Sequence, residues 1–290
     1  LITRQSKIKA VGLCHGYQGV RNVARVIGID PEKVEAQSFG INHNIWLNKF
    51  YYEGVDAYPI LNDWIKNKAE QFWNSPECGI SDDMGPKAVD LYSRLGLFPI
   101  GDTATPGGDC YHRWYHFDRA TEQKWKEDPE AWYQRHIHHV NNSVAAFKQL
   151  AANSRQKATS LFPPDKTHET NVSIIDAIVN DHPAIFQVNI PNKGSIPGFA
   201  DDVVVELPAM VSAAGIQGLH MGDLPKRIML SINDQILRME RDLEAFLSRD
   251  RKMLLELVLS YPWTRTVEQA EGLLEDVFAH PDNTEMAEYY

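Results

Sequence analysis

The sequence lacks the features that mark membrane, secreted and nucleic-acid-binding proteins. It has no run of about 18 apolar residues, so it predicts no transmembrane helix, and its first residues lack the apolar core of a secretion signal. Three scattered cysteines, Cys14, Cys78 and Cys110, do not form a disulfide framework, which favours a reducing cytoplasm. The net charge of −10 argues against nucleic acid as a partner, because an acidic surface repels phosphate groups.

Three common catalytic and cofactor motifs are also absent from the sequence. No G-x-G-x-x-G follows a predicted strand, so the sequence shows no dinucleotide-binding loop. It contains neither a G-x-x-x-x-G-K-[ST] phosphate loop nor a G-x-S-x-G turn that would expose a catalytic serine. An active site in this chain must therefore use other residues.

The pattern of apolar residues predicts a mixed α/β chain. The apolar run over 8–13 indicates a short buried strand, and Val20, Val23 and Val26 indicate a helix that ends at Gly28. A strand, a polar turn and a helix are typical of the floor of an α/β active site. We expect further strands between 34 and 52 and around 185–190 and 203–207, and helices over 59–72, 87–95, 119–158 and much of the tail.

The end of the first predicted strand carries a thiol and an imidazole, Cys14 and His15. A second imidazole, His43, lies between two asparagines in the next strand region. A thiolate and an imidazole together suit a transition metal, and two protein ligands leave positions open for substrate or water. In the structural alternative, Cys14 is a small buried residue and His43 a hydrogen-bonded core histidine, because their spacing specifies no ligand geometry.

The least regular stretch, residues 96–116, is rich in glycine but also in acidic, basic and aromatic side chains. Asp102 in this stretch is a candidate proton-transfer group, or else an aspartate that caps a turn. The aromatic residues Trp114, Tyr115 and Phe117 could stack on a sugar or simply pack. The histidines of His136–His139 lie in a polar segment that we expect at the surface.

Four motifs, "GLCHG", "GINHNIWLN", "LFPIGDT" and "VNIPNKG" with "DDVVVELPA", occur in this order across nearly the whole chain. Together they resemble glycoside hydrolase family 4, and most closely its α-glucosidase branch with a Cys-His-Gly motif. The resemblance implies an enzyme that uses NAD and a divalent metal, commonly manganese. Such enzymes cleave glycosides by oxidation, elimination, addition of water and reduction.

The resemblance also implies roles for individual residues. Cys14 and His43 match the two protein ligands of the metal. Asp102 matches an aspartate with a proton-transfer role, and His15 is the candidate acid that assists departure of the leaving group. Asn42, next to the second metal ligand, is a candidate substrate contact, as is His43 itself.

The implied substrate is a small α-glycoside, and an unphosphorylated α-glucoside fits the branch best. An α-glucuronide or α-galacturonide is the alternative within the family, with Arg113 as the candidate clamp for the substrate carboxylate. Two interpretations outside the family stay open. The chain could be the metal-free substrate domain of a hydroxyacid dehydrogenase, or a structural or regulatory fragment that binds no metal.

The resemblance implies a division of the chain into two parts. Residues 1–30 would be the remnant of a dinucleotide-binding domain, with the end of a Rossmann-type sheet. Residues 31–290 would form a mixed α+β substrate domain like the C-terminal domain of lactate and malate dehydrogenases. Because the family's NAD-binding loop is absent from this sequence, we expect the chain alone to be inactive. We also expect a cytoplasmic homodimer or homotetramer without a membrane partner.

Overall fold

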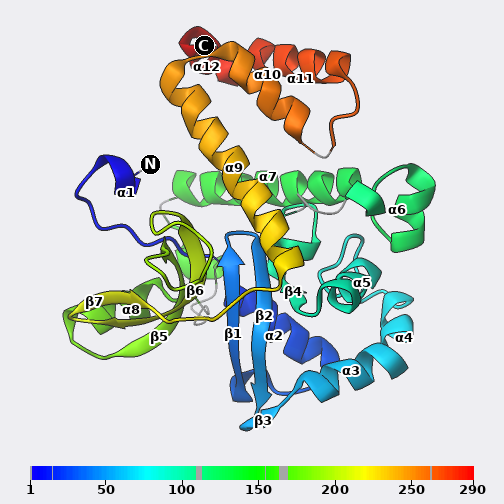
Figure 1. Ribbon diagram of the computed structural model, residues 1–290, viewed down its shortest axis with the longest axis vertical. Coiled ribbons are helices and arrows are strands. Elements are labelled where there is room, and N and C mark those ends of the chain that lie inside the picture. Colours follow the sequence, from blue (N-terminus) through cyan, green and yellow to red (C-terminus); the bar gives the residue numbers. More distant parts are fainter. Residues whose placement is uncertain (1, 15, 109–112, 154, 163–168, 262) are drawn as a thin grey trace.

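The central feature of the computed structural model is an antiparallel sheet (Figure 1). The structure describes all residues except 1, 15, 109–112, 154, 163–168 and 262. In this part of the chain the strand order is β3-β2-β1-β6-β5, with β4 paired to β2 and β7 to β6. The strands are β1 (Val34–Ile41), β2 (Asn44–Tyr52), β3 (Val55–Asp56), β4 (Phe98–Ile100), β5 (Ala184–Pro191), β6 (Val204–Ser212) and β7 (Gly215–Gly218).

Helices surround the sheet and extend from it. They are α1 (Ile2–Gln5), α2 (Gly16–Ile27), α3 (Tyr58–Asn67), α4 (Ala69–Trp73), α5 (Pro86–Leu95), α6 (Arg119–Trp125), α7 (Pro129–Ala152), α8 (Asn171–Val179), α9 (Lys226–Ser248), α10 (Arg251–Ser260), α11 (Val267–Ala279) and α12 (Thr284–Tyr289). Helix α9 rises from the sheet to a group formed by α10, α11 and α12 (Figure 1). No helix in the described part of the chain is both long and apolar enough to span a membrane.

One hydrophobic core lies between the β5–β6 half of the sheet and helices α8 and α9. Leu207 and Val211 of β6 and Ile228 and Ile232 of α9 are all fully buried in this core. Burial of each such aliphatic side chain contributes about 1.5–3 kcal/mol relative to an exposed position. This core therefore fixes the start of α9 on the sheet.

A second core lies under α2, α3, α5, β2 and β4. Val23 of α2, Leu61 of α3, Leu91 of α5 and Phe98 of β4 are almost completely buried there. Helix α2 sits so close to the end of β4 that a Cβ atom at Gly19 would clash with the Ile100 side chain. The second core thus brings the N-terminal turns of α2 to the end of β4.

Most elements predicted from the sequence are confirmed, and the mixed α/β class with them. The predicted helix 59–72 is two helices, because the backbone leaves helical geometry at Lys68. The predicted strand over 8–13 is wrong. Gly12 forms only an isolated antiparallel bridge to Asn189, and Ile8 is two-thirds exposed. A short apolar run becomes a strand only where a neighbouring strand can pair with it, and residues 8–11 have none in the described structure.

The contact at Gly19 predicts the effect of a single methyl group. Gly19→Ala should lower the free energy of unfolding by about 1–3 kcal/mol, because the extra carbon overpacks the α2–β4 contact. Gly272→Ala in α11 is the matched control, since a Cβ atom there meets open space. It should raise stability by about 0.5–1 kcal/mol through helix propensity. Urea unfolding of both variants tests this, and equal effects would contradict the close packing at Gly19.

Candidate active site

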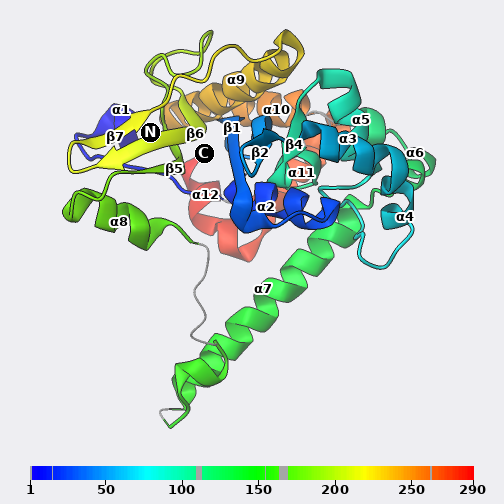
Figure 2. The ribbon, with the colours of Figure 1, turned by 90° about the horizontal axis from the view of Figure 1, so that it is seen from below.

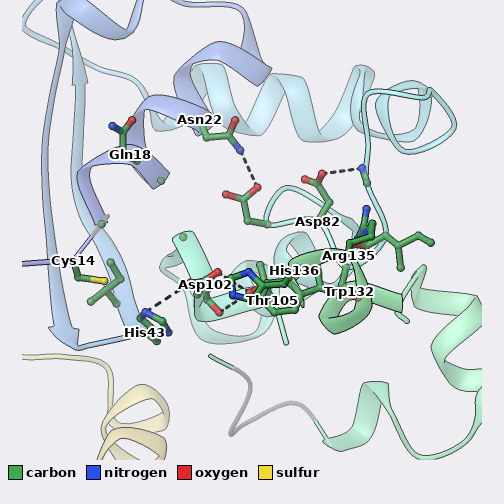
Figure 3. Close-up of a pocket in the computed structure, with 18 of the residues that line it drawn as sticks. Cys14, Gln18, Asn22, His43, Asp82, Asp102, Thr105, Trp132, Arg135 and His136 are labelled. Atoms are coloured by element: carbon green, nitrogen blue, oxygen red, sulfur yellow. Dashed lines mark hydrogen bonds and ion pairs between the residues drawn. The ribbon is translucent and has the colours of Figure 1, made fainter. Parts of the chain in front are cut away.

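A cavity of about 730 Å³ lies where several segments of the chain meet (Figure 3). Its walls are Cys14, the first turns of α2, the β1–β2 turn with His43, the loop 79–83, the segment after β4 with Asp102, and one flank of α7. Such a volume is within the range of small-molecule sites in proteins. The cavity is therefore large enough for a substrate, and it collects polar side chains from distant parts of the sequence.

The β1–β2 turn places His43 at the cavity. Asn42 and His43 form a two-residue hairpin between the paired residues Ile41 and Asn44. His43 adopts φ +59°, a left-handed conformation that is uncommon for residues other than glycine. The next residue anchors the turn, because Asn44 Nδ2 donates to Ser231 Oγ and to Gln235 Oε1 at 3.1 Å each.

Asp102 is held beside His43 by its neighbours in the sequence. Thr103 Oγ1 accepts the Ile45 amide at 2.9 Å and donates to the Ile45 carbonyl at 3.0 Å, which ties the segment to β2. Thr105 Oγ1 donates to Asp102 Oδ1 at 2.9 Å, while Asp102 Oδ2 lies 3.7 Å from His43 Nε2. The threonine bonds therefore leave one carboxylate oxygen of Asp102 directed at the His43 ring.

The Cys14 thiol lies beside the His43 ring, close enough to interact with it. This contact is the main reason that the pKa of His43 rises from 6.5 to about 9, and partial burial opposes it. The Gly107 carbonyl, 3.1 Å from His43 Nδ1, and the charge of Asp102 raise the pKa further. The sulfur of Cys14, the carbonyl oxygen of Gly107 and the carboxylate of Asp102 thus surround the ring and favour its protonated form.

Behind Cys14 lies a buried carboxyl group, Glu206 of β6. Its pKa is raised by burial, and hydrogen bonds from Asn189, Gln187 and Cys14 oppose the rise. Asn189 Nδ2 donates to Glu206 Oε2 at 3.3 Å, but the buried Asn189 Oδ1 has no hydrogen-bond partner among the described residues. The Gly12–Asn189 backbone bonds fix the segment that leads to Cys14.

The side chains of this region provide some of the ligands that a divalent transition metal needs. Cys14 supplies a sulfur and His43 a ring nitrogen, and both side chains reach the same cavity. Among the described residues no group of three or more His, Cys, Asp or Glu side chains forms a complete metal site. Two protein ligands would leave positions open to the cavity, and a catalytic metal needs such open positions for substrate or water.

The opposite wall of the cavity carries two adjacent carboxyl groups (Figure 3). Asp82 accepts the amides of Gly79 and Met84 at 2.9 Å each, and Asp83 Oδ1 accepts Asn22 Nδ2 at 2.8 Å. Burial, and then the charge of Asp82, raise the pKa of Asp83 from 3.8 to about 7. This wall can therefore hold a proton near neutral pH.

One flank of α7 closes the cavity. Trp132 and His136 lie stacked with ring centroids 5.8 Å apart, and Arg135 Nη2 donates to the Ile80 carbonyl at 2.9 Å (Figure 3). His139 lines the cavity as well. The expectation of exposed histidines over His136–His139 is confirmed, yet two of them also face this cavity.

The structure brings together three of the residues singled out from the sequence: Cys14, His43 and Asp102. Asn42 instead lines two neighbouring grooves, one of which it shares with His43. His15 and the side chain of Arg113 lie outside the described structure. Tyr115 is buried and packs edge-to-face on Trp125, so it has a packing role.

Sequence reasoning missed several residues of the site. Glu206 is a charged residue within an otherwise apolar strand, and Asp82 and Asp83 are adjacent acids ahead of a helix. An unpaired charge in a buried strand signals a polar partner nearby, so Glu206 could have been found. Trp132 and Arg135 carry no such local signal, because only the path of α7 brings them to the cavity.

The sequence of this chain matches one known protein family. Residues 38–264 match the family 4 glycosyl hydrolase C-terminal domain. An alpha-galacturonidase of Thermoanaerobacter italicus is 23% identical over 286 residues, which cover 94% of this chain and 61% of that protein. The chain thus spans about three-fifths of the length of this relative.

Solved structures show the same fold. A 6-phospho-alpha-glucosidase from gut microorganisms, in complex with NAD and Mn²⁺, has a TM-score of 0.68 at 20% identity, covering 95% of this chain and 61% of that one. The 6-phospho-beta-glucosidase of Thermotoga maritima, with manganese, NAD⁺ and glucose-6-phosphate, has a TM-score of 0.65 at 21% identity. That match covers 95% of this chain and 60% of the other.

The raised pKa of Asp83 predicts a pH-dependent stability. The folded state keeps the proton up to about pH 7, whereas the unfolded chain releases it near 3.8, so the free energy of unfolding should fall as pH rises through this window. Asp83→Asn should remove this fall, which we expect to be on the order of 1–2 kcal/mol after solvent screening. Urea unfolding at pH 4.5 and 8 measures it, with the exposed Asp223→Asn as control. An unchanged pH dependence in Asp83→Asn would contradict the assignment.

Proposed function

Because this chain belongs to the family 4 glycosyl hydrolases, we propose that it forms the substrate- and metal-binding part of an NAD- and metal-dependent α-glycosidase. The observation that carries the proposal is the grouping of Cys14, His43 and Asp102 in one cavity. Two potential metal ligands and a proton-transfer group meet there without any local sequence relation. A purely structural fragment would not need these groups to face a cavity.

The cofactor proposal takes its support from structures of similar fold. Two of them contain NAD and manganese, and the present chain covers about 60% of each. We propose that residues 31–290 form the substrate and metal part, and that residues 1–30 belong to the end of a dinucleotide-binding domain. Since the chain carries no glycine-rich dinucleotide loop, NAD binding would rest mainly on that domain, and the chain alone would be inactive.

Cys14 and His43 would hold the metal, because their side chains are adjacent and open to the cavity. A bound divalent metal would polarise a sugar oxygen and stabilise negative charge that develops on the substrate. Because its pKa is raised to about 9, His43 keeps a second ring proton at neutral pH. That proton occupies the lone pair that a metal would use, so metal binding would release it. Glu206 supports this arrangement from behind through its contact with Cys14.

Asp102 is placed to move a proton on the substrate. Its Oδ1 atom is fixed by Thr105, so Oδ2 is the oxygen available beside His43. The side chain is 42% exposed toward the cavity, which leaves room for a sugar between it and the opposite wall. A carboxylate within reach of the reacting carbon can remove or return a proton in each turnover.

For the substrate we propose an α-galacturonide in preference to an α-glucoside. The relatives support this choice, because the alpha-galacturonidase of Thermoanaerobacter italicus matches nearly the whole chain. The cavity supports it through Arg135, whose guanidinium lines the wall and uses one nitrogen to bind the Ile80 carbonyl. Its other donors suit a carboxylate, which arginine binds in a two-pronged manner.

The first test concerns the metal pair in the full-length protein. Hydrolysis of p-nitrophenyl α-galacturonide should require NAD, Mn²⁺ and a reducing agent together. Cys14→Ser should weaken Mn²⁺ binding by at least about 100-fold, the upper end of what loss of a supporting residue costs. Cys78→Ser is the control, because Cys78 lies outside the metal pair. Activity that survives both chelation and removal of NAD would contradict the proposed mechanism.

The second test concerns the sugar. Arg135→Gln should lower kcat/KM for the α-galacturonide by about 10–100-fold, since a hydrogen bond to a charged group contributes roughly 1.5–3 kcal/mol. The same variant should change kcat/KM for the α-glucoside by less than about threefold. Arg25→Gln, a change at an exposed arginine on the α2 side of the cavity, is the matched control. An equal loss of kcat/KM for both sugars would show that Arg135 does not bind the substrate carboxylate.

A further inference from the structure

Next to the cavity wall formed by residues 79–83 lies a buried cluster of three side chains that can carry charge: Lys87, His116 and Glu127. The side chains of Lys87 and His116 are completely buried, and that of Glu127 is 1% exposed. Lys87 Nζ lies 2.9 Å from Glu127 Oε2 and 3.4 Å from His116 Nε2. None of the three lines the cavity, so none can contact a substrate there.

Stability alone does not explain an ion pair at this place. Lys87 lies in the first turn of α5, and its helix neighbours Ala88 and Leu91 belong to the second core. Removing two charges from water costs free energy that their attraction does not always offset, and well-packed apolar side chains are often as stable. Lys87 is also the one lysine that is buried among the described residues. The contacts of the pair therefore indicate a further role.

Glu127 connects the ion pair to the cavity wall through Ser81. The Ser81 side chain lies close enough to Glu127 to interact with it. The Ser81 amide donates to the Lys126 carbonyl at 3.0 Å, and Ser81 Oγ accepts the amide of Asp128 at 3.1 Å. Ser81, which lines the cavity, is thus held by three consecutive residues of the segment that leads into α7.

The backbone at Ser81 is strained and controls a contact of Arg135. Ser81 has φ +55°, a left-handed conformation that persists in residues other than glycine only where the surroundings hold it. The Ile80 carbonyl shares a peptide plane with the Ser81 amide, so the φ angle of Ser81 sets its direction. This carbonyl accepts a hydrogen bond from Arg135 Nη2 at 2.9 Å.

The same contacts hold the start of α7, the helix that carries Arg135. Asp128 caps this helix, because its Oδ1 accepts the amide of Ala131 at 3.0 Å. No other described helix or strand packs extensively against α7. Figure 2 shows its N-terminal half under the body of the protein and its C-terminal half projecting away. The place of Arg135, about two turns into the helix, therefore depends on how the first turn is held.

We propose that the buried Lys87–Glu127 ion pair positions Arg135 and thereby sets the preference of the site for a sugar that carries a carboxylate. The pair holds Ser81, and Ser81 holds both the Ile80 carbonyl and the start of α7. The inference rests on the proposed function, in which Arg135 binds the substrate carboxylate. Lys87 and Glu127 are positioning residues, because they act on the sugar only through Arg135.

The first experiment measures the cavity wall without a substrate, in the full-length protein. Lys87→Met with Glu127→Leu removes both charges together, so no unpaired charge is left in the core, and urea unfolding reports the global stability. Amide hydrogen exchange over residues 79–83 and 126–132 should become faster by at least about 10-fold, because local opening no longer breaks the link to the pair. Unchanged exchange in both segments would overturn the positioning role.

A matched control and a second variant accompany this experiment. Lys33→Met with Glu53→Leu removes a lysine–glutamate pair that is 2.6 Å apart but 52% and 54% exposed, and it should leave the exchange of both segments unchanged. Ser81→Gly suits the left-handed backbone and breaks the same link without touching the core. It should also speed exchange over 126–132, and it replaces the first variant if that one does not fold.

The second experiment measures sugar preference. In the Lys87→Met, Glu127→Leu protein, kcat/KM for the α-galacturonide relative to the α-glucoside should fall by at least about 10-fold, mostly through KM, since a misplacement of about 1 Å can cost that much. In an Arg135→Gln background the same two changes should alter this ratio by less than about twofold, because both act through one group. Equal losses of kcat/KM for both sugars, or the full fall in the Arg135→Gln background, would overturn the inference.

The two experiments separate this inference from the proposed function. A wild-type protein that hydrolyses neither sugar would contradict the proposed function and, with it, the sugar preference. Hydrogen exchange decides independently whether the buried ion pair holds the cavity wall.

Discussion

The contact between Cys14 and His43 determines how the rest of the site is built. It joins the segment before α2 to the β1–β2 hairpin at the cavity, and Asp102 lies directly beside this pair. Asn44 holds the hairpin to α9, Thr103 holds the Asp102 segment to β2, and Asn189 holds the backbone before Cys14. These anchors, and the two cores behind them, therefore hold Cys14 and His43 side by side.

Sequence patterns predicted the elements better than the site. The strands around His43 and the buried strands β5 and β6 followed directly from their apolar patterns. The resemblance to a known family singled out Cys14, His43 and Asp102, and the structure places these three residues in one cavity. Neither periodicity nor spacing could have done so, because their proximity arises from packing between segments that are far apart in the chain.

The errors and omissions have equally specific causes. The run over 8–13 has the composition of a buried strand, but only Gly12 meets a strand partner. Asp82 and Asp83 look like ordinary loop acids until Asn22 and the cavity wall surround them. In each case the decisive information was the tertiary environment.

The link between the two halves of the sheet has a consequence for folding kinetics. Strands β1 and β2 form a local hairpin, and β5 and β6 are also neighbours along the chain, but β1 meets β6 through the pair Gly40 and Glu206. Pairing of β1 with β6 closes a long loop and places the buried carboxyl group of Glu206 against the β1–β2 hairpin, which can form independently. Contacts of such large sequence separation form slowly. Pairing of β1 with β6, rather than formation of either hairpin, should therefore limit how fast the site assembles.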